Sequence, residues 1–530
     1  MINNVHSDYT KHEKAWVRAS DCYAGEEVIK SKTTQYLPKL GHHYDPKTGD
    51  QEYEVYLNYA KFFGATYRTV TALTGLVFRK DIYVEGKNTE KYIHDFTIDN
   101  RSITTAAESA VNETLLKYRM GILVSYPDID TSNMTKQEFI DKGIHAYAAL
   151  YKTEDIINWK LEKVNGRMVP TLIVLKEAIA DPFPTDKFDT DTITQYSVLE
   201  LENGVYKHSV YLDDLAYQTT ELTRTTYGYL YKEIYPEING KTLDYIPFFP
   251  ITPKGISWDI EDSPMAPIVD LNIGHYRNSA TYEQALVKTA SPTTVLRGFQ
   301  GDRDKKIILG GSQAILVSAD GGADYLEYQG TGISEIRQAM DIKQKQMAVL
   351  GAGILSNEKT SNVSAESESI QQSGEQAVLA SIAKSASDAF TQALRLMVSW
   401  DDYEGDLSEE DLAKISVRLN TDFSPNSLTA NDINALIVAW QKMALSDKEL
   451  FEIFKKGEII PAEMTFDEHI TQVESSAMFQ LVNSVEQGAN NPLREKAIQA
   501  STTTAGAERL SNPNDPNNPN SKDNIITNEE

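Results

Sequence analysis

Apolar residues recur at helical spacing through most of the first 150 positions. The pattern predicts helices over 8–30, 51–78, 103–118 and 135–150, with a strand over 121–126. The second of these helices carries aromatic residues along one stripe, which is typical of a face that packs into a core. The chain therefore opens as a mainly helical module.

A strand-rich stretch follows over 155–251. It contains three Asn-Gly pairs, at 165–166, 203–204 and 239–240, among β-branched and aromatic residues. Asn-Gly favours the left-handed backbone conformations that tight hairpin turns need. We expect an antiparallel β-module here, and hence an α+β chain that is mainly helical outside it.

Two helices that flank a short insert form the most distinctive segment. The pattern predicts a first helix over 263–289, an insert over 290–332 and a second helix over 333–350, which ends at a Gly-Ala-Gly break. A further helix is predicted over 364–400, with an apolar row, largely in steps of four, at Val378, Ile382, Ala386, Phe390, Leu394 and Met397. At ~1.5 Å per residue this last helix would be about 55 Å long.

The insert and the second helix cannot bury their apolar residues alone. The insert holds three short strand candidates, over 307–309, 314–317 and 325–328, and strands of this length do not close a core. The second helix carries a seam at a/d-like spacing, formed by Ile333, Ile336, Met340, Lys343, Met347 and Leu350. We expect the strands and the seam to pack against neighbouring subunits, the seam in a coiled-coil manner.

The last part of the chain returns to helices. A strand is predicted over 415–420, and helices are predicted over 429–440, 447–455 and 465–486. The final 20 residues contain seven Asn and three Pro without periodicity. We therefore expect the tail after residue 500 to be disordered.

The chain is strongly acidic. Its 530 residues include 51 basic and 77 acidic side chains, for a net charge of −26. This charge excludes a broad basic groove that grips nucleic acid by neutralising phosphates. It is compatible with a surface past which DNA moves without adhering, although solubility is the simpler explanation.

Several classes of protein are excluded by what the sequence lacks. The single cysteine, Cys22, rules out a disulfide framework within the chain and a multi-cysteine zinc site. No stretch approaches the ~20 apolar residues of a membrane span. The N-terminus lacks the basic start and apolar run of a signal peptide. These features fit assembly in a reducing cytoplasm.

We find no motif for catalysis, cofactor binding or metal binding. The segment 240–242 comes nearest to a phosphate loop, but Tyr235 occupies the position of its first glycine. The glycines at 351–353 lack the third glycine and the preceding strand of a dinucleotide site. The pairs His42–His43 and Asp401–Asp402 are interpreted as a polar loop and a solvated acidic turn. We therefore predict that the protein is not an enzyme and that it binds no cofactor or metal.

Two groups of basic residues stand out from the acidic background. The first lies in the insert and comprises Arg297, Arg303, Lys305 and Lys306. The second lies on the following helix and in the loop after it, and comprises Lys343, Lys345 and Lys359. Each residue alone is typical of a solvated surface. If the segment lines a tube, the same residues would give loose, salt-sensitive contact with DNA phosphates.

The order of these elements resembles that of the portal proteins of tailed bacteriophages, and one subfamily of them more closely. Six short fragments in this order look similar to fragments of that subfamily: Tyr36-Leu-Pro38, Tyr59-Ala60, Gly75-Leu-Val-Phe-Arg79, Ile157-Asn-Trp159, Leu271-Asn-Ile-Gly-His-Tyr-Arg277 and Leu419-Asn-Thr-Asp-Phe423. Each fragment is short, and their ordered combination is what makes the resemblance specific. The resemblance covers residues 8–475 and leaves out the tail after about residue 500.

The resemblance implies a portal fold with wing, stem, clip and crown regions. The expected regions are an N-terminal wing with the β-module over 1–262, stem helices over 263–289 and 333–350, a clip over 290–332, a tunnel loop over 351–363, a long wing helix and strand over 364–423, a crown over 424–500, and a tail over 501–530. The chain would then be one subunit of a ring, a dodecamer in this family.

The function implied by the resemblance is that of a DNA channel at one capsid vertex. Double-stranded DNA would pass through it during packaging and ejection without sequence readout. Implied partners are the terminase and head–tail adaptors at the clip, the major capsid protein around the wing, and scaffold. The protein would assemble in the host cytoplasm and reside in the virion. The expected site residues are Lys343, Lys345, Lys359 and Asn362 facing DNA in the channel, and Arg297, Arg303, Lys305 and Lys306 as a basic patch on the clip.

Two other interpretations remain open. The chain could be another oligomeric virion protein such as a head–tail adaptor, although such rings are usually built from much shorter chains. It could also be an enzyme whose acid, base and nucleophile lie in no recognisable motif. The predicted tunnel loop contains a single basic residue, Lys359. This composition does not favour tight binding of DNA by the loop.

Overall fold

The computed structural model describes residues 2–475 with gaps. The gaps are 128–137, 139–141, 165, 182–185, 189, 213–222, 226–227, 239, 291–292, 300–316, 327–330, 352–364, 403–404, 422, 424–429, 443, 458 and 461–463. The chain divides into two compact units, Met1–Phe423 and Ser424–Glu530. All strands of the described residues belong to the first unit.

Helices form most of the first unit outside its central strand-rich part. Its helices are α1 (Ser7–Ala24), α2 (Glu26–Ser31), α3 (Gly49–Tyr59), α4 (Ala65–Val77), α5 (Glu90–His94), α6 (Ile103–Lys117), α8 (Ala266–Ala290), α9 (Thr331–Leu350), α10 (Ala365–Trp400) and α11 (Glu409–Lys414). Short 3₁₀ turns are Thr33–Gln35, Gly41–Tyr44 and Thr153–Asp155.

The strands form antiparallel sheets. They are β1 (Tyr83–Glu85), β2 (Met120–Ser125), β3 (Tyr147–Lys152), β4 (Ile156–Val164), β5 (Arg167–Ala180), β6 (Thr192–Glu202), β7 (Val205–Leu212), β8 (Thr223–Arg224), β9 (Tyr229–Ile234), β10 (Glu237–Ile238), β11 (Lys241–Thr242), β12 (Phe248–Ile251), β13 (Thr293–Phe299), β14 (Val317–Leu326) and β15 (Ser416–Arg418). Helices and antiparallel sheets together confirm the α+β class.

A six-stranded sheet in the order β4-β5-β6-β7-β9-β8 confirms the β-module predicted over 155–251. Asn203 and Gly204 join β6 to β7 with φ angles of 52° and 82°, the left-handed conformations that a two-residue hairpin needs. Gly166 and Gly240 also have positive φ, between β4 and β5 and between β10 and β11. The three Asn-Gly pairs therefore marked three real hairpins.

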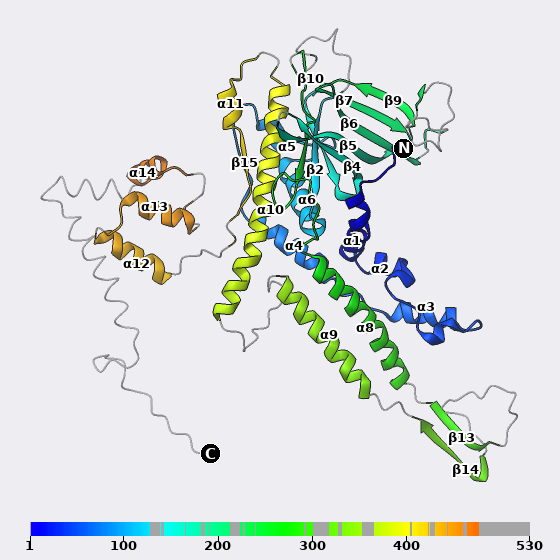
Figure 1. Ribbon diagram of the computed structural model, residues 1–530. Helices are drawn as coiled ribbons and strands as arrows, with labels where there is room; N and C mark the ends of the chain where they lie inside the picture. The colour runs from blue at the N-terminus through cyan, green and yellow to red at the C-terminus, as the bar shows by residue number, and fades with distance from the viewer. Residues whose placement is uncertain are drawn as a thin grey trace, which may run out of the picture. The chain divides into compact units, whose positions relative to one another are not determined.

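The core of the first unit lies where α10 meets α6 and the three-stranded sheet β12-β2-β3 (Figure 1). The predicted apolar row of α10 is fully buried at Ile382, Ala386, Phe390, Leu394 and Met397. Val378, the first predicted member of this row, is 41% exposed. An α-helix has 3.6 residues per turn, so residues four positions apart are displaced by about 40° around its axis. A row of residues in steps of four therefore rotates away from the face that contacts the core.

Two long helices of the prediction are interrupted in the structure. The helix expected over 8–30 breaks at Gly25, whose φ of 97° lies outside the helical region. The helix expected over 51–78 becomes α3 and α4, with a non-helical segment at 60–64. The predicted aromatic stripe is therefore wrong beyond Tyr56, since Tyr59 and Tyr67 are 42% and 50% exposed. The physical cause is a set of tertiary hydrogen bonds from α8, described below.

The helix predicted over 135–150 is also partly wrong. Its end is strand β3, which pairs along its whole length with β2, from Met120 opposite Lys152 to Ser125 opposite Tyr147. Ladder hydrogen bonds to β2 and burial of Ala148 between the neighbouring elements override the helical spacing of the apolar residues. Most of the start of this segment lies outside the described residues.

Side chains of α10 bond to the open edge of strand β15, which lies within the strand predicted over 415–420. Strand β15 pairs with β1 on one side only. On its other side, Thr391 Oγ1 accepts from the N–H of Val417 at 2.9 Å, and Ser387 Oγ accepts from the N–H of Leu419 at 3.0 Å. These bonds satisfy backbone groups at the strand edge and fasten it to the long helix.

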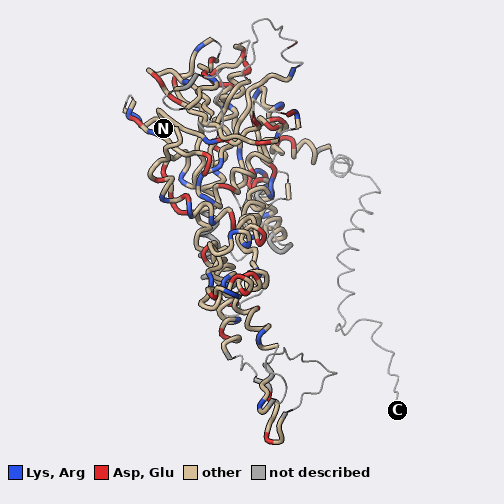
Figure 2. Tube along the Cα trace, turned by 90° about the vertical axis from the view of Figure 1, so that its right-hand side faces the viewer, with Lys and Arg blue, Asp and Glu red and all other residues tan. Residues whose placement is uncertain are grey.

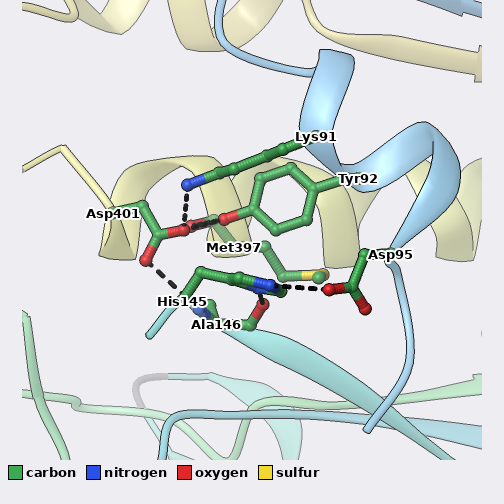
Figure 3. A network of polar contacts seen from close by, with 7 residues as sticks. All are labelled: Lys91, Tyr92, Asp95, His145, Ala146, Met397 and Asp401. Atoms are coloured by element: carbon green, nitrogen blue, oxygen red, sulfur yellow. Dashed lines mark hydrogen bonds and ion pairs between the residues drawn. The ribbon is translucent and has the colours of Figure 1, made fainter. Parts of the chain in front are cut away.

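The carboxylate of Asp401, directly after α10, ties the end of that helix to two other elements (Figure 3). Its Oδ2 accepts from Lys91 Nζ at 2.5 Å and from the Tyr92 hydroxyl, both on α5. Its Oδ1 accepts from the N–H of Ala146, just before β3, at 3.1 Å. The Asp401 side chain is only 4% exposed. Three donors therefore surround one buried carboxylate.

A histidine extends this network, and its setting corrects one prediction. His145 Nε2 lies 3.0 Å from Asp95 Oδ2, and its ring meets the edge of the Tyr92 ring. The interpretation of Asp401 as part of a solvated acidic turn is wrong. A negative charge at the C-terminal end of a helix is disfavoured by the helix dipole, and the surrounding donors offset that cost.

The second unit contains α12 (Ala430–Gln441), α13 (Asp447–Lys456) and α14 (Phe466–Ser475). These helices confirm the predictions over 429–440 and 447–455 and the first part of the one over 465–486. Ser446 and Glu449 form a reciprocal capping box at the start of α13. The Phe451 ring contacts the rings of Phe466 and His469 at centroid distances of 5.4 and 5.2 Å, which packs α13 against α14.

We predict that Asp401→Ala lowers the free energy of unfolding of the first unit by about 2–3 kcal/mol, because it leaves buried donors without their charged acceptor. Urea titration followed by circular dichroism measures the change. Asp388→Ala, an exposed aspartate of α10, is the matched control and should be nearly neutral. Equal effects of the two substitutions would contradict the assigned role of the network.

Candidate functional site

The candidate site is the helical hairpin formed by α8 and α9. The two helices contact each other and lie side by side in Figure 1, with the ribbon of β13 and β14 beyond their adjoining ends in both views. Ser263 starts the hairpin: its Oγ accepts from the N–H of Met265 at 2.9 Å and donates to the carbonyl of Leu115 at 2.8 Å. The proline at 264 is tolerated because it precedes the first helical hydrogen bonds.

Asn272 attaches α8 to the interruption between α3 and α4. It is fully buried, and its Oδ1 accepts from the N–H and the hydroxyl of Thr66 at 3.2 and 3.1 Å. Its Nδ2 donates to the carbonyl of Phe63 at 2.6 Å. These bonds replace the helical partners that the 60–64 segment loses, so the break costs few unsatisfied backbone groups.

Ser279 and Arg277 make two more attachments on the same helix. Ser279 Oγ donates to the carbonyl of Lys61 at 2.7 Å and lies 3.0 Å from the N–H of Lys61. Arg277 Nε donates to the carbonyl of Tyr36 at 2.8 Å. The Tyr36 hydroxyl in turn donates to Asp21 at 2.5 Å. Two fragments of the sequence resemblance, 36–38 and 271–277, therefore meet in space.

Helix α9 rests on α8 at one glycine. A Cβ on Gly274 would lie 3.3 Å from Lys343 Cε, so the missing side chain lets the methylenes of Lys343 lie against α8. One residue further, Gln344 Nε2 donates to His275 Nε2 at 3.0 Å. Met347 is fully buried. Lys343 and Met347 of the predicted seam are therefore covered within their own chain and not, as had been expected, by a neighbouring subunit. The reason is that α8 offers the nearest complementary surface.

The end of α9 is fixed at Gly351. Its N–H donates to the carbonyl of Met347 at 2.9 Å, and a Cβ at this position would lie 2.9 Å from the Thr69 side chain on α4. Any other residue at this position would require the Thr69 side chain to move. The predicted tunnel loop begins here, and its remaining residues, with Lys359 and Asn362, lie outside the described residues.

The insert between the helices is a two-stranded ribbon in its described part. Strand β13 pairs antiparallel with β14, with Thr293 opposite Leu326 and Arg297 opposite Gly322. Strand β13 was not predicted, and it pairs with β14, which runs from the end of the candidate strand 314–317 into the candidate strand 325–328. For this part of the insert the partner is the same chain and not the neighbouring subunit that was expected. Arg297 forms an exposed ion pair with Asp324. Arg303, Lys305 and Lys306 lie outside the described residues, as does the candidate strand at 307–309.

The hairpin is almost neutral on a strongly acidic chain. Helices α8 and α9 together carry five basic and four acidic residues, a net charge of +1 against −26 for the whole chain. Figure 2 shows acidic and basic residues intermixed along the described trace, without a basic stripe. Lys343 is half-buried against α8, whereas Lys345 is exposed. Of the four residues predicted to face DNA, the structure describes Lys343 and Lys345, and Lys345 is the more exposed of the two.

Neither a metal-binding group nor a membrane span is found among the described residues. They contain no group of three His, Cys, Asp or Glu side chains that could hold a metal ion. His43 of the predicted polar loop is instead buried, and its Nδ1 accepts from the N–H of Leu40 at 3.0 Å. The part of the chain that the structure describes also holds no helix long and apolar enough to cross a membrane.

Sequence reasoning missed the residues that hold the hairpin in place. Asn272, Gly274 and Ser279 were noted only as parts of a fragment or not at all. A signal was present, because polar residues at 272 and 279 lie seven positions apart on an otherwise apolar helix face. Such spacing places both on the same side of a helix, where buried polar groups need partners.

Comparison with known proteins finds one match to a family model, over part of the chain, and three structural likenesses. Residues 264–401 match a family model described as a domain of unknown function, DUF4055. No curated protein matches the sequence. The structure is similar to a chain of the neck of an empty GTA particle computed with C6 symmetry, with a TM-score of 0.36 and 10% identity, over 73% of this chain and 88% of that chain.

Two further solved structures show the same degree of likeness. A chain of the virion of a native gene transfer agent (GTA) particle has a TM-score of 0.35 and 9% identity, over 72% of this chain and 87% of that chain. A chain of the neck of a native GTA particle computed with C12 symmetry has a TM-score of 0.36 and 10% identity, over 73% and 88%. The DUF4055 match begins just before α8 and ends just after α10, so it contains the whole hairpin.

We predict that Asn272→Ala lowers the free energy of unfolding by about 2–4 kcal/mol, because the buried carbonyl of Phe63 and N–H of Thr66 lose their partner. Chemical denaturation measures this loss. Asn278→Ala, on the same helix and only half-buried, provides the control and should change stability by less than about 1 kcal/mol. A neutral Asn272→Ala would show that the attachment does not hold the hairpin.

The hairpin should also weaken in acid. Burial, with a smaller contribution from Lys343, lowers the pKa of His275 below its ordinary value of 6.5, against a weaker opposing effect of Asp341. A depressed histidine pKa means that stability is full above the ordinary pKa and falls as the pH drops through it.

We predict that His275→Gln, which stays neutral and can still bond to Gln344, reduces the stability lost between about pH 7.5 and pH 5.5. Thermal unfolding of both proteins at the two pH values measures the difference. The other buried histidines are present in both proteins, so their contribution to the acid-induced loss of stability cancels in the comparison. An identical acid-induced loss in variant and wild type would contradict the role of His275.

Proposed function

We propose that the chain is a non-enzymatic structural subunit of a phage-type virion, and specifically of a portal ring through which double-stranded DNA is packaged and ejected. In this proposal α8 and α9 are the stem and form the channel wall. The β13–β14 ribbon belongs to the clip, where terminase and head–tail adaptors dock. The second unit is the crown.

One observation carries the proposal: among the described residues, the hairpin carries exposed apolar side chains on its outer faces. Ile342 and Val349 lie two turns apart on α9 and are 47% and 52% exposed, and Leu286 and Val287 on α8 are 37% and 40% exposed. A pair of helices cannot cover its own outer faces. Copies arranged side by side around an axis would cover them, because a heterologous contact that closes makes a ring.

The charge balance supports a channel for DNA. Walls with a net charge near zero neither bind the phosphate backbone tightly nor repel it as the acidic body would. Lys345 would give a loose contact in the channel, joined by Lys343, Lys359 and Asn362 if these face the same space. Arg297 of the ribbon pairs with Asp324, so the proposed clip patch depends on Arg303, Lys305 and Lys306.

A head–tail adaptor or another ring-forming virion protein is the second candidate. It accounts for the uncovered apolar faces equally well. The length of the hairpin and the large helical and sheet-bearing body around it favour the portal, because an adaptor needs a docking surface but no long wall.

Electron microscopy of the purified protein tests the proposal. We expect rings with a central hole about as wide as duplex DNA, built from many copies. Replacing Ile342 and Val349 with Ser should prevent ring formation while circular dichroism stays unchanged, because the water-facing side of α9 does not support the fold of one chain. Compact monomers of the wild type at all concentrations would refute the portal, and rings with a much wider hole would favour an adaptor.

A further inference from the structure

We propose that a pocket between α1 and α8 receives a carboxylate side chain from a second copy of this chain and so joins neighbouring subunits. The pocket has a volume of about 660 Å³. Its lining, called here the α1–α8 pocket, comprises Glu13, Lys14, Val17, Arg18, Gln35, Tyr36, Asp270, Ile273 and Arg277. The proposal rests on the ring assembly proposed above and names the chemistry of one of its contacts.

The pocket gathers three cations at positions that helical geometry brings together. Lys14 and Arg18 are four residues apart on α1 and share a face, and Arg277 projects from α8. Within the described residues, Lys14 has no ion-pair partner, and Arg277 bonds to the Tyr36 carbonyl but to no carboxylate. Arg18 lies 3.4 Å from Asp270, and its buried Nε has no hydrogen-bond acceptor among the described residues.

The charges and the apolar side chains that line the pocket suit a carboxylate carried on methylene groups. Ile273 is buried and Val17 half-buried, so the floor is apolar and strengthens a charge contact above it. With Glu13 and Asp270 counted against the three cations, the pocket carries a net charge of +1 on a chain of −26. An Asp or Glu with apolar methylenes completes such a site.

Duplex DNA is the less suitable occupant. It presents a charge every ~1.7 Å along its axis. A continuous row of phosphates would extend past the cations to the exposed carboxylates of Glu13 and Asp270, the latter with 61% of its side chain accessible, whereas a single carboxylate needs to contact the cations alone. A second copy of a chain with 77 acidic residues supplies isolated carboxylates in abundance.

The test is a double charge reversal, Lys14→Glu with Arg18→Glu, compared with Lys32→Glu with Lys163→Glu. Both variants change the net charge equally, and Lys32 and Lys163 are exposed elsewhere on the first unit. Sedimentation velocity over a concentration series measures assembly. We expect the first variant to need about tenfold or more protein for ring formation, and the control to assemble like the wild type.

A chemical cross-link identifies the partner directly. Carbodiimide joins the Lys14 amine to a carboxylate it touches, and rings mixed from isotopically labelled and unlabelled chains show whether the link joins two copies. We expect a link from Lys14 to an Asp or Glu of another copy, and loss of this link in Lys14→Arg rings, since a guanidinium does not couple.

The outcomes separate this inference from the proposed function. Rings that form equally well in both double variants overturn the pocket contact and leave the portal intact. Normal rings that lose only DNA retention show that the pocket faces DNA, which also overturns it. A wild type that never forms rings refutes the proposed function itself. Circular dichroism checks that the variants fold.

Discussion

A helix that stops inside a protein leaves backbone N–H and C=O groups that need other partners. The segment 60–64 is such a stop, and Asn272 and Ser279 of α8 supply the partners it needs. The constraint acts in both directions. The side chains of α8 stabilise the interruption between α3 and α4, together with the Glu26 carboxylate, which accepts from the N–H of Phe62 at 3.1 Å. In return, the bonds to the interruption hold α8 in its position.

This constraint determines where the hairpin can be. With α8 held by Asn272, Ser279 and Arg277, α9 lies close to it at Gly274, where α8 lacks a side chain. Gly351 then brings the end of α9 against α4. The hairpin is thus attached near its base, and in the part of the chain that the structure describes its outer faces carry exposed apolar side chains. The Asp401 network and the bonds to β15 hold α10 in the same body.

The sequence predicted the parts of the fold that depend on local chemistry. Three Asn-Gly turns located their hairpins, and the bounds of α10 followed from its apolar spacing, because both signals act within a few residues. Contacts between residues far apart in the sequence could not be predicted from local patterns. Nothing near residues 60–64 shows that α8 will bond to them, and Asp401 looked solvated because its donors on α5 and before β3 lie far away in the sequence.

The same limit applies to the candidate site. Sequence reasoning identified the helix–insert–helix order, and it assigned the seam at Lys343 and Met347 to a neighbour because α8 could not be seen as the nearer partner. Only the structure shows which faces remain uncovered: Ile342 and Val349 on α9 lie outside the contact with α8.

The net charge of the chain then limits which surfaces can form contacts between copies. Copies that each carry −26 repel one another, so they can meet only where the surface is locally neutral or basic. The hairpin, at +1, and the α1–α8 pocket, also at +1, both meet this condition. Solubility accounts for the acidity of the rest of the surface. Solubility does not explain why charge is balanced on a hairpin that also carries exposed apolar side chains, whereas the contact between copies proposed above would explain both features.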